Sequence, residues 1–259
     1  MLPDTFKKII NEAADLGVNS VKLNWRGEST MNPWFPIMPK YVKERANGAT
    51  FIDRITNSNF KFTANTVQII EALCHQTKVK VSYDSFRKSV FEKQRAGGNH
   101  EITTGNIDLF YNWPGRDNIL VIQAVRTKNN ADEDIEGEVK KRWPSALVSI
   151  RDMVGGRVEK DLTEYTHKER DYSERQSCIQ AHARLIFDTQ GQATACCPDI
   201  RQEINLGSIR DMTISQIWNS EAALKLRKDL LSLKAFKNSP CKNCSSFETF
   251  KGYQANHES

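Results

Sequence analysis

The chain has 259 residues, of which 39% are apolar and 27% charged, and its net charge is +5. This composition is that of an ordinary globular protein, which excludes wholesale disorder and fibrous folds. No apolar run approaches the ~20 residues of a membrane helix, and no charged-then-apolar leader opens the chain. We therefore expect a cytoplasmic protein without a membrane partner.

The basic residues do not form one dense patch. The tightest groups are Lys140-Lys141-Arg142 and the segment 225–228, and both lie in helix-like sequence beside acidic residues. This pattern is typical of solvated helix faces rather than of a nucleic-acid surface. We do not expect a nucleic-acid partner.

The first part of the chain alternates helix-like and strand-like segments. A first helix begins near Asp4, and Gly17 suits its end. Strands are predicted over 18–25, 50–56, 78–83, 119–125 and 146–150, and helices from about 33, over 64–75, over 86–95 and after Asn130, which is placed to cap the last one. Repeated strand–helix units predict an α/β fold with a parallel sheet, either open or curled into a barrel.

The pattern changes near residue 157. The segment 157–177 is charged and weakly periodic, which indicates a linker or crossover. Beyond it, two short strands flank Asp188-Thr189-Gln190-Gly191, a β-hairpin signal, and a helix follows from about Ser215. The sequence thus predicts a first domain over 1–157, a linker over 158–177 and a small α+β domain over 178–259.

The cysteines carry the strongest chemical signal. Five of the six lie after residue 177, at Cys178, Cys196, Cys197, Cys241 and Cys244. In a reducing compartment, clustered cysteines are more often metal ligands than disulfides. A Cys-x-x-Cys turn with hairpin cysteines offers four thiolates, which zinc and iron–sulfur clusters both accept. Spacing alone leaves both metals open.

The text around these cysteines resembles the auxiliary-cluster domain of radical S-adenosylmethionine (SAM) proteins, the SPASM family. The resemblance rests on Cys178, Cys196 and Cys241-x-x-Cys244, and on Asp188-Thr189-Gln190-Gly191, Cys196-Cys197-Pro198-Asp199, Leu206-Gly207-Ser208-Ile209 and Ile217-Trp218-Asn219-Ser220. It implies one auxiliary [4Fe–4S] cluster held by Cys178, Cys196, Cys241 and Cys244. Cys197 would be the spare, because adjacent strand residues face opposite sides.

The C-terminal tail departs from the full SPASM pattern. Phe250 and Gln254 occupy the next two positions at which that pattern has cysteines. The domain therefore resembles the shortened "twitch" version, with a single cluster.

The first domain resembles the partial barrel of radical SAM proteins. Asn24-Trp25-Arg26-Gly27-Glu28-Ser29 is similar to the "GGEP" segment, Ile55-Thr56-Asn57-Ser58 to "TNG" and Val81-Ser82-Tyr83-Asp84 to "SIDG", and Arg95 is near an arginine that helps hold SAM in relatives. The resemblance implies a SAM-binding set of Gly27, Glu28, Asn57, Ser82, Asp84 and Arg95.

One motif of that family is absent from the sequence. Its Cys-x-x-x-Cys-x-x-Cys triad precedes the Gly-Glu segment, but none of the 26 residues before Gly27 is cysteine. We therefore expect a barrel that lacks its first strand. We also expect SAM to serve as a cofactor only when an N-terminal segment or partner chain supplies the triad.

The resemblance implies the C-terminal part of an enzyme that is not catalytic alone. Such an enzyme would modify a peptide, sugar or small metabolite by 5′-deoxyadenosyl radical chemistry. The alternatives are a non-catalytic binding module that keeps the cluster and a scaffold held by a four-cysteine zinc site.

Overall fold

The computed structural model describes residues 1–152, 177–199, 201–237, 241, 242 and 244. The chain divides into two compact units, one of residues 10–153 and the other of residues 1–9 together with 154–259. The predicted linker lies outside the described residues apart from Ser177. The predicted domain boundaries stay predictions.

The first unit is built on a five-stranded parallel sheet. Its strands are β1 (Ser20–Lys22), β2 (Asp53–Ser58), β3 (Lys78–Ser82), β4 (Ile119–Arg126) and β5 (Leu147–Asp152). They pair in sequence order, β1-β2-β3-β4-β5. Because parallel crossovers are right-handed and each one here steps in the same direction, the connecting helices fall on one side of the sheet. The α/β fold with a parallel sheet is confirmed, in its barrel-type rather than its doubly wound order.

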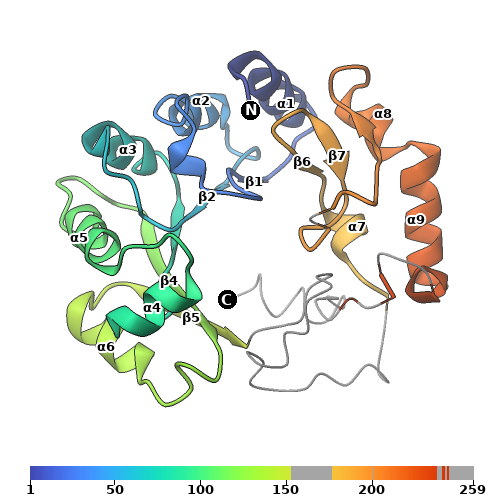
Figure 1. Ribbon diagram of the computed structural model, residues 1–259. Helices are drawn as coiled ribbons and strands as arrows, with labels where there is room; N and C mark the ends of the chain where they lie inside the picture. The colour runs from blue at the N-terminus through green and yellow to red at the C-terminus, as the bar shows by residue number, and fades with distance from the viewer. Residues whose placement is uncertain (153–176, 200, 238–240, 243, 245–259) are drawn as a thin grey trace. The chain divides into compact units, whose positions relative to one another are not determined.

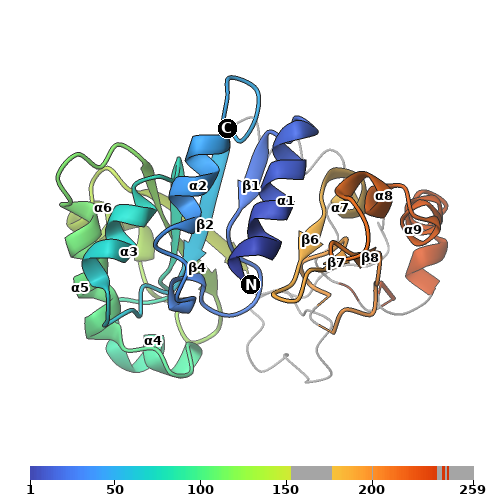
Figure 2. The same cartoon turned by 90° about the horizontal axis from the view of Figure 1, so that it is seen from above.

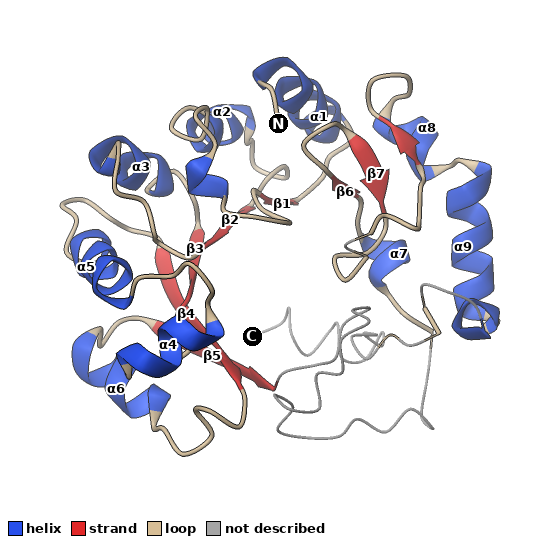
Figure 3. Ribbon diagram, viewed as in Figure 1, coloured by secondary structure: helices blue, strands red, loops and turns tan. Residues whose placement is uncertain are grey.

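The connecting helices cover that one side. The helical segments of this part of the chain are α1 (Pro3–Asp15), the 3-10 turn η1 (Ser29–Met31), α2 (Met38–Arg45), α3 (Thr66–Leu73), α4 (Lys88–Gln94), α5 (His100–Tyr111) and α6 (Ile135–Arg142). Figures 1 and 3 show α2, α3, α5 and α6 along the same side of the strands, and Figure 2 shows α3, α5 and α6 from above. We call the side of the sheet opposite these helices the inner face.

The core lies between the sheet and these helices. Val79, Val81 and Ile122 from the strands are fully buried there against Ile70 of α3 and Phe110 of α5. In β4, Leu120 through Ile122 are all buried, so the near-continuous apolar run reflects a central strand. This core fixes the positions of the carboxyl ends of the strands, where polar side chains such as Asn57 and Ser82 lie.

Two features of this unit differ from the sequence-based expectation. Helix α5 was not predicted, because Thr103, Thr104 and Gly105 are weak helix formers. The helix nevertheless forms, and the side chain of Asn99 caps its start by accepting a hydrogen bond from Ile102 N (3.0 Å). The prediction that Asn130 caps the following helix was wrong. Asp134 is the cap of α6, and Asn130 has another role described below.

The second unit contains the predicted hairpin. Its elements are α7 (Gln180–Ala183), β6 (Ile186–Phe187), β7 (Gln192–Thr194), β8 (Gly207–Ser208), α8 (Ile214–Trp218), α9 (Glu221–Leu231) and the 3-10 turn η2 (Lys234–Lys237). Strands β6, β7 and β8 form an antiparallel sheet. Gly191 sits at the hairpin turn with φ +86°, and a Cβ there would lie 2.7 Å from Ile209 Cγ2. The turn therefore requires glycine.

None of the helices in the described ranges is long and apolar enough to cross a membrane.

Candidate functional site

A polar cluster lies at the carboxyl ends of β2 and β3. Asn57 and Ser82 both lie on the inner face, and Ser82 Oγ donates to Asn57 Oδ1 (3.2 Å). The Asn57 amide donates to Asn24 Oδ1 (3.1 Å) at the end of β1. Carboxyl ends of parallel barrel strands are where such folds carry ligand-binding groups. The structure thus brings Asn57 and Ser82, both predicted from the sequence, into direct contact.

Glu28 lies on the loop after β1, and its carboxylate accepts hydrogen bonds from other groups of the chain. Its Oε1 accepts from Thr30 N (3.3 Å), Thr30 Oγ1 (2.7 Å) and Ser58 Oγ (2.7 Å), and its Oε2 accepts from Asn59 N (2.6 Å). A carboxylate offers about four lone-pair positions. Glu28 therefore fastens the Gly27-Glu28 loop to the end of β2. Gly27 itself is exposed with φ +77°, and its Cβ position faces open space.

Asp84 and Arg95 form an ion pair beside this cluster. Arg95 Nε lies 2.8 Å from Asp84 Oδ2, and a terminal nitrogen donates to Oδ1 (3.0 Å). The other terminal nitrogen donates to Asn59 Oδ1 (2.7 Å). Asp84 is 4% exposed and also accepts from Val125 N (2.8 Å). Asn59 thereby links the ion pair to Glu28, so one network joins Glu28, Asp84 and Arg95.

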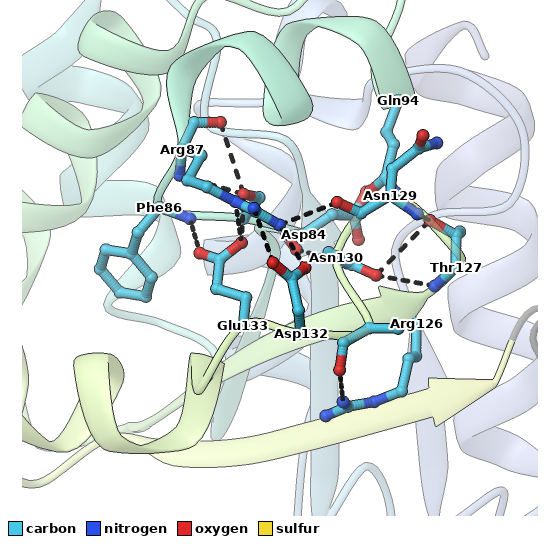
Figure 4. A network of polar contacts seen from close by, with 12 residues as sticks. Asp84, Phe86, Arg87, Gln94, Arg126, Thr127, Asn129, Asn130, Asp132 and Glu133 are labelled. Carbon is cyan, nitrogen blue, oxygen red and sulfur yellow. Dashed lines mark hydrogen bonds and ion pairs between the residues drawn. The ribbon is translucent and has the colours of Figure 1, made fainter.

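A second layer of polar contacts holds Asp84 in place (Figure 4). Asn130 is fully buried, and its Nδ2 donates to the backbone oxygens of Asp84 (2.7 Å) and Val125 (3.0 Å). Its Oδ1 accepts from Thr127 N (2.7 Å). Asn130 therefore connects the loop after β3 to the end of β4. Because its side chain is engaged in these bonds, it does not cap α6.

Glu133 anchors the same loop from the other side. Its carboxylate accepts from Ser85 Oγ (2.5 Å) and Phe86 N (2.6 Å), and Arg87 Nε lies 3.3 Å away. Arg87 also pairs with Asp132 (2.8 Å). Because the carboxylate of Glu133 is only 9% exposed, its bonds to this loop are shielded from water and hold it firmly.

The network contains residues that sequence reasoning missed. Asn59, Asn130 and Glu133 act on residues that lie 31 to 48 positions away in the chain. Asn59 directly follows the Ile55-Thr56-Asn57-Ser58 segment, and this adjacency was the one available signal. For the other two, no local sequence pattern indicates the partner.

The four predicted cluster cysteines line one cavity in the second unit. Cys178, Cys196, Cys241 and Cys244 are all buried, at 5 to 8% exposure. The cavity is otherwise lined mainly by apolar side chains, from Ala181, Ala195, Ile204, Leu226, Leu230 and Phe236, together with Gln180. Cys197 is exposed; it lies in the turn that follows β7, so its exposure does not come from the strand alternation that the sequence suggested. The tail positions Phe250 and Gln254 lie outside the described residues.

Local bonds position these cysteines. Cys244 N donates to Cys241 O (3.1 Å), which closes the Cys-x-x-Cys turn. Asp199, three residues after Cys196, is 1% exposed and accepts from Thr194 Oγ1 (3.0 Å) and Ile204 N (2.9 Å). The buried carboxylate thus fixes the loop that leaves the hairpin at Cys196.

The cavity offers a donor set of four thiols. They surround a shared, mainly apolar space. Four thiolates are a donor set that zinc and iron–sulfur clusters both accept.

Comparison with known proteins assigns the second unit. Residues 178–245 match the SPASM family, an iron-sulfur cluster-binding domain. No curated protein sequence matches the chain.

Solved structures share the fold of the chain. Native anSMEcpe with bound AdoMet aligns with a TM-score of 0.70 at 13% identity, over 95% of this chain and 80% of that one. BtrN in complex with AdoMet and 2-DOIA aligns with 0.59 at 18% identity, over 95% and 80%. SuiB from Streptococcus suis aligns with 0.59 at 15% identity, over 93% and 64%.

At these identities, the likeness concerns the fold alone, which in the first unit of this chain is built on a parallel five-stranded sheet. Residues 178–245 belong to the SPASM family, an iron-sulfur cluster-binding domain.

Proposed function

We propose that Cys178, Cys196, Cys241 and Cys244 hold one auxiliary [4Fe–4S] cluster. The observation that carries this proposal is their burial around a single, mainly apolar cavity. When bound, such a cluster supplies one-electron transfer. The exposed thiol of Cys197 has no part in the ligand set.

We further propose that SAM binds at the polar cluster formed by Gly27, Asn57, Ser82, Asp84 and Arg95. Each terminal nitrogen of the Arg95 guanidinium donates one hydrogen bond, one to Asp84 and the other to Asn59. Each of these nitrogens carries a second N–H, and such a pair of donors is suited to a carboxylate. Asp84 holds the guanidinium in a fixed orientation, and exposed Gly27 lets a ligand approach the backbone.

In this proposal Glu28 belongs to the same SAM-binding set. Four hydrogen bonds within the chain hold its carboxylate and fasten Gly27 at the end of β2. Three of these bonds go to Oε1 and one to Oε2, so Oε2 keeps an acceptor position for a ligand.

The chain would then serve as the C-terminal part of an enzyme. An N-terminal segment or partner chain would supply the Cys-x-x-x-Cys-x-x-Cys triad, and the substrate would be a peptide, sugar or small metabolite modified by 5′-deoxyadenosyl radical chemistry. Support comes from the neighbours: anSMEcpe is solved with AdoMet and the Cp18Cys peptide, SuiB with the peptide SuiA, and BtrN with 2-DOIA.

The SAM site is tested by equilibrium dialysis of labelled SAM against the reconstituted chain. Arg95→Gln should weaken binding about tenfold or more, since it removes a charged hydrogen-bond donor. Arg116→Gln is the matched control, because Arg116 donates to Tyr111 and Asn118 and lies over the Phe110 ring, and none of these residues belongs to the polar cluster. Equal losses in both variants would contradict the assignment.

The enzymatic role is tested by assaying 5′-deoxyadenosine after dithionite reduction. We expect none from the chain alone and turnover once a triad-bearing segment is added. Tight SAM binding without cleavage under both conditions would favour the non-catalytic binding module.

A further inference from the structure

The inner face of the sheet carries a group of cations. Lys78 and Lys80 alternate along β3 with Val79 and Val81, which pack against the helices. Because successive strand residues face opposite sides, both lysines lie on the inner face. Lys22 shares that face, since it pairs with Ile55, which in turn pairs with Lys78.

A fourth cation lies on the same face, farther along the sheet. Arg151 of β5 pairs with Val125 of β4, and both alternate with the helix-facing residues Ala124 and Ile150. Among the residues of the five strands, Asp53 is the only acid on the inner face, and it pairs with Ser20 at the start of β2. Among the strand residues of this face, four side chains are thus basic and one is acidic.

Lys80 is the centre of this group. It is half-buried, and its pKa is lowered from 10.5 to about 8, chiefly by desolvation and then by the nearby charges of Lys22, Arg151 and Lys78, with Asp53 opposing them. In the described part of the chain, no ion pair or hydrogen bond of the Lys80 ammonium is found. Burial and neighbouring cations raise the free energy of the charged Lys80 side chain, and a bound anion lowers it.

The spacing suits one compact anion with more than a single charge. Lys22 on β1 and Lys78 on β3 are separated by β2, so they lie two strand spacings apart, about 9.6 Å, and Lys78 and Lys80 lie about 6.6 Å apart along β3. Long lysine side chains bridge these separations, so those of Lys22, Lys78 and Lys80 can reach a common point. A phosphate monoester carries about −1.5 to −2 charges at neutral pH and three acceptor oxygens. A carboxylate carries one charge. Toward the strand ends, this group borders Asn57 and Ser82 of the polar cluster.

We propose that the inner face binds a phosphate group, and that the substrate is a phosphorylated small molecule held by Lys80 with Lys22 and Lys78. The substrate part of this inference rests on the proposed function. The anion site itself does not, because binding requires neither SAM nor an iron–sulfur cluster.

The test is isothermal titration of the full chain with phenyl phosphate, and with phenyl sulfate as a monoanion of matched shape. Phenyl phosphate should bind, and phenyl sulfate should bind several-fold more weakly. Lys80→Gln should lower the affinity for phenyl phosphate about tenfold. Lys40→Gln, which removes the same charge from an exposed position on α2, should leave it unchanged. Should Lys80→Gln not fold, Lys78→Gln replaces it with the same expectation.

A second readout is the proton uptake on binding. Near pH 8, where Lys80 titrates, a bound dianion raises its pKa, so the apparent enthalpy should depend on the ionisation enthalpy of the buffer. Lys80→Gln should remove this dependence. Equal binding of the two phenyl esters, or no effect of Lys80→Gln, overturns the proposal.

A glutamate-rich peptide is included as a third ligand. Tighter binding of that peptide than of phenyl phosphate would also overturn the proposal, in favour of an acidic peptide. A chain that binds phenyl phosphate but fails the SAM tests would retain the anion site and reject the proposed function.

Discussion

Replacing Lys80 with methionine should stabilise the fold at neutral pH. The pKa of Lys80 falls from 10.5 to about 8, a difference of 2.5 units, which nominally corresponds to about 3 kcal/mol at 1.36 kcal/mol per unit. Because the side chain is only half-buried, solvent screening reduces this to about 1 kcal/mol. Methionine retains the apolar stem and removes the charge, so Lys80→Met should be more stable by about that amount.

The pH dependence gives the sharper result. Between about pH 8 and pH 10.5 the unfolded chain holds the Lys80 proton and the folded chain has released it. The stability of the wild type therefore rises with pH across this window, and below it the full cost remains. The advantage of Lys80→Met should be largest at pH 7 and shrink as pH rises through this window.

The assay is urea unfolding across this pH range in phosphate-free buffer, followed by tryptophan fluorescence, since Trp143 is buried in the same unit. Lys40→Met, at an exposed position, serves as the control and should show no such trend. A Lys80→Met variant less stable than the wild type at pH 7, or an advantage that grows with pH, refutes the reasoning.

Three other changes follow from the structure. Cys241→Ser should abolish most cluster absorption after reconstitution, whereas Cys197→Ser, at the exposed neighbouring thiol, should retain it; equal spectra would reject the ligand assignment. Asn130→Ala should lower the free energy of unfolding by about 1–3 kcal/mol, because it leaves buried backbone groups unpaired, and exposed Asn112→Ala should change it little. Gly191→Ala should destabilise the hairpin by about 1 kcal/mol or more, measured by thermal unfolding of the reconstituted protein.

The elements predicted best are those whose local pattern agrees with their environment. Strand β4 lies between β3 and β5 in a parallel sheet, and six of its eight residues are apolar, so its sequence alone indicates an interior strand. The hairpin is marked by the turn that ends at Gly191, which only glycine fits. Helix α5 lacks such a local signal: packing of Ile107 and Phe110 against the core outweighs the poor helix propensity of its middle.

Of the two candidate sites, the sequence indicates the one that rests on short-range features and misses most of the one that rests on long-range contacts. The cysteines could be grouped from spacing and resemblance, because Cys-x-x-Cys and the hairpin are short-range features. The polar network could not, since Asn130 and Glu133 contact partners more than 40 residues away. The prediction for Asn130 was wrong because an asparagine before acidic residues is typical of a helix cap, whereas its amide here is buried between two strand ends.

The metal content of the reconstituted protein tests the central claim most directly. Protein reconstituted anaerobically with iron and sulfide should be brown and contain about four iron and four sulfide ions per chain, as expected for one [4Fe–4S] cluster at Cys178, Cys196, Cys241 and Cys244. A colourless protein with one zinc ion per chain would contradict the account and leave a zinc-stabilised scaffold in its place.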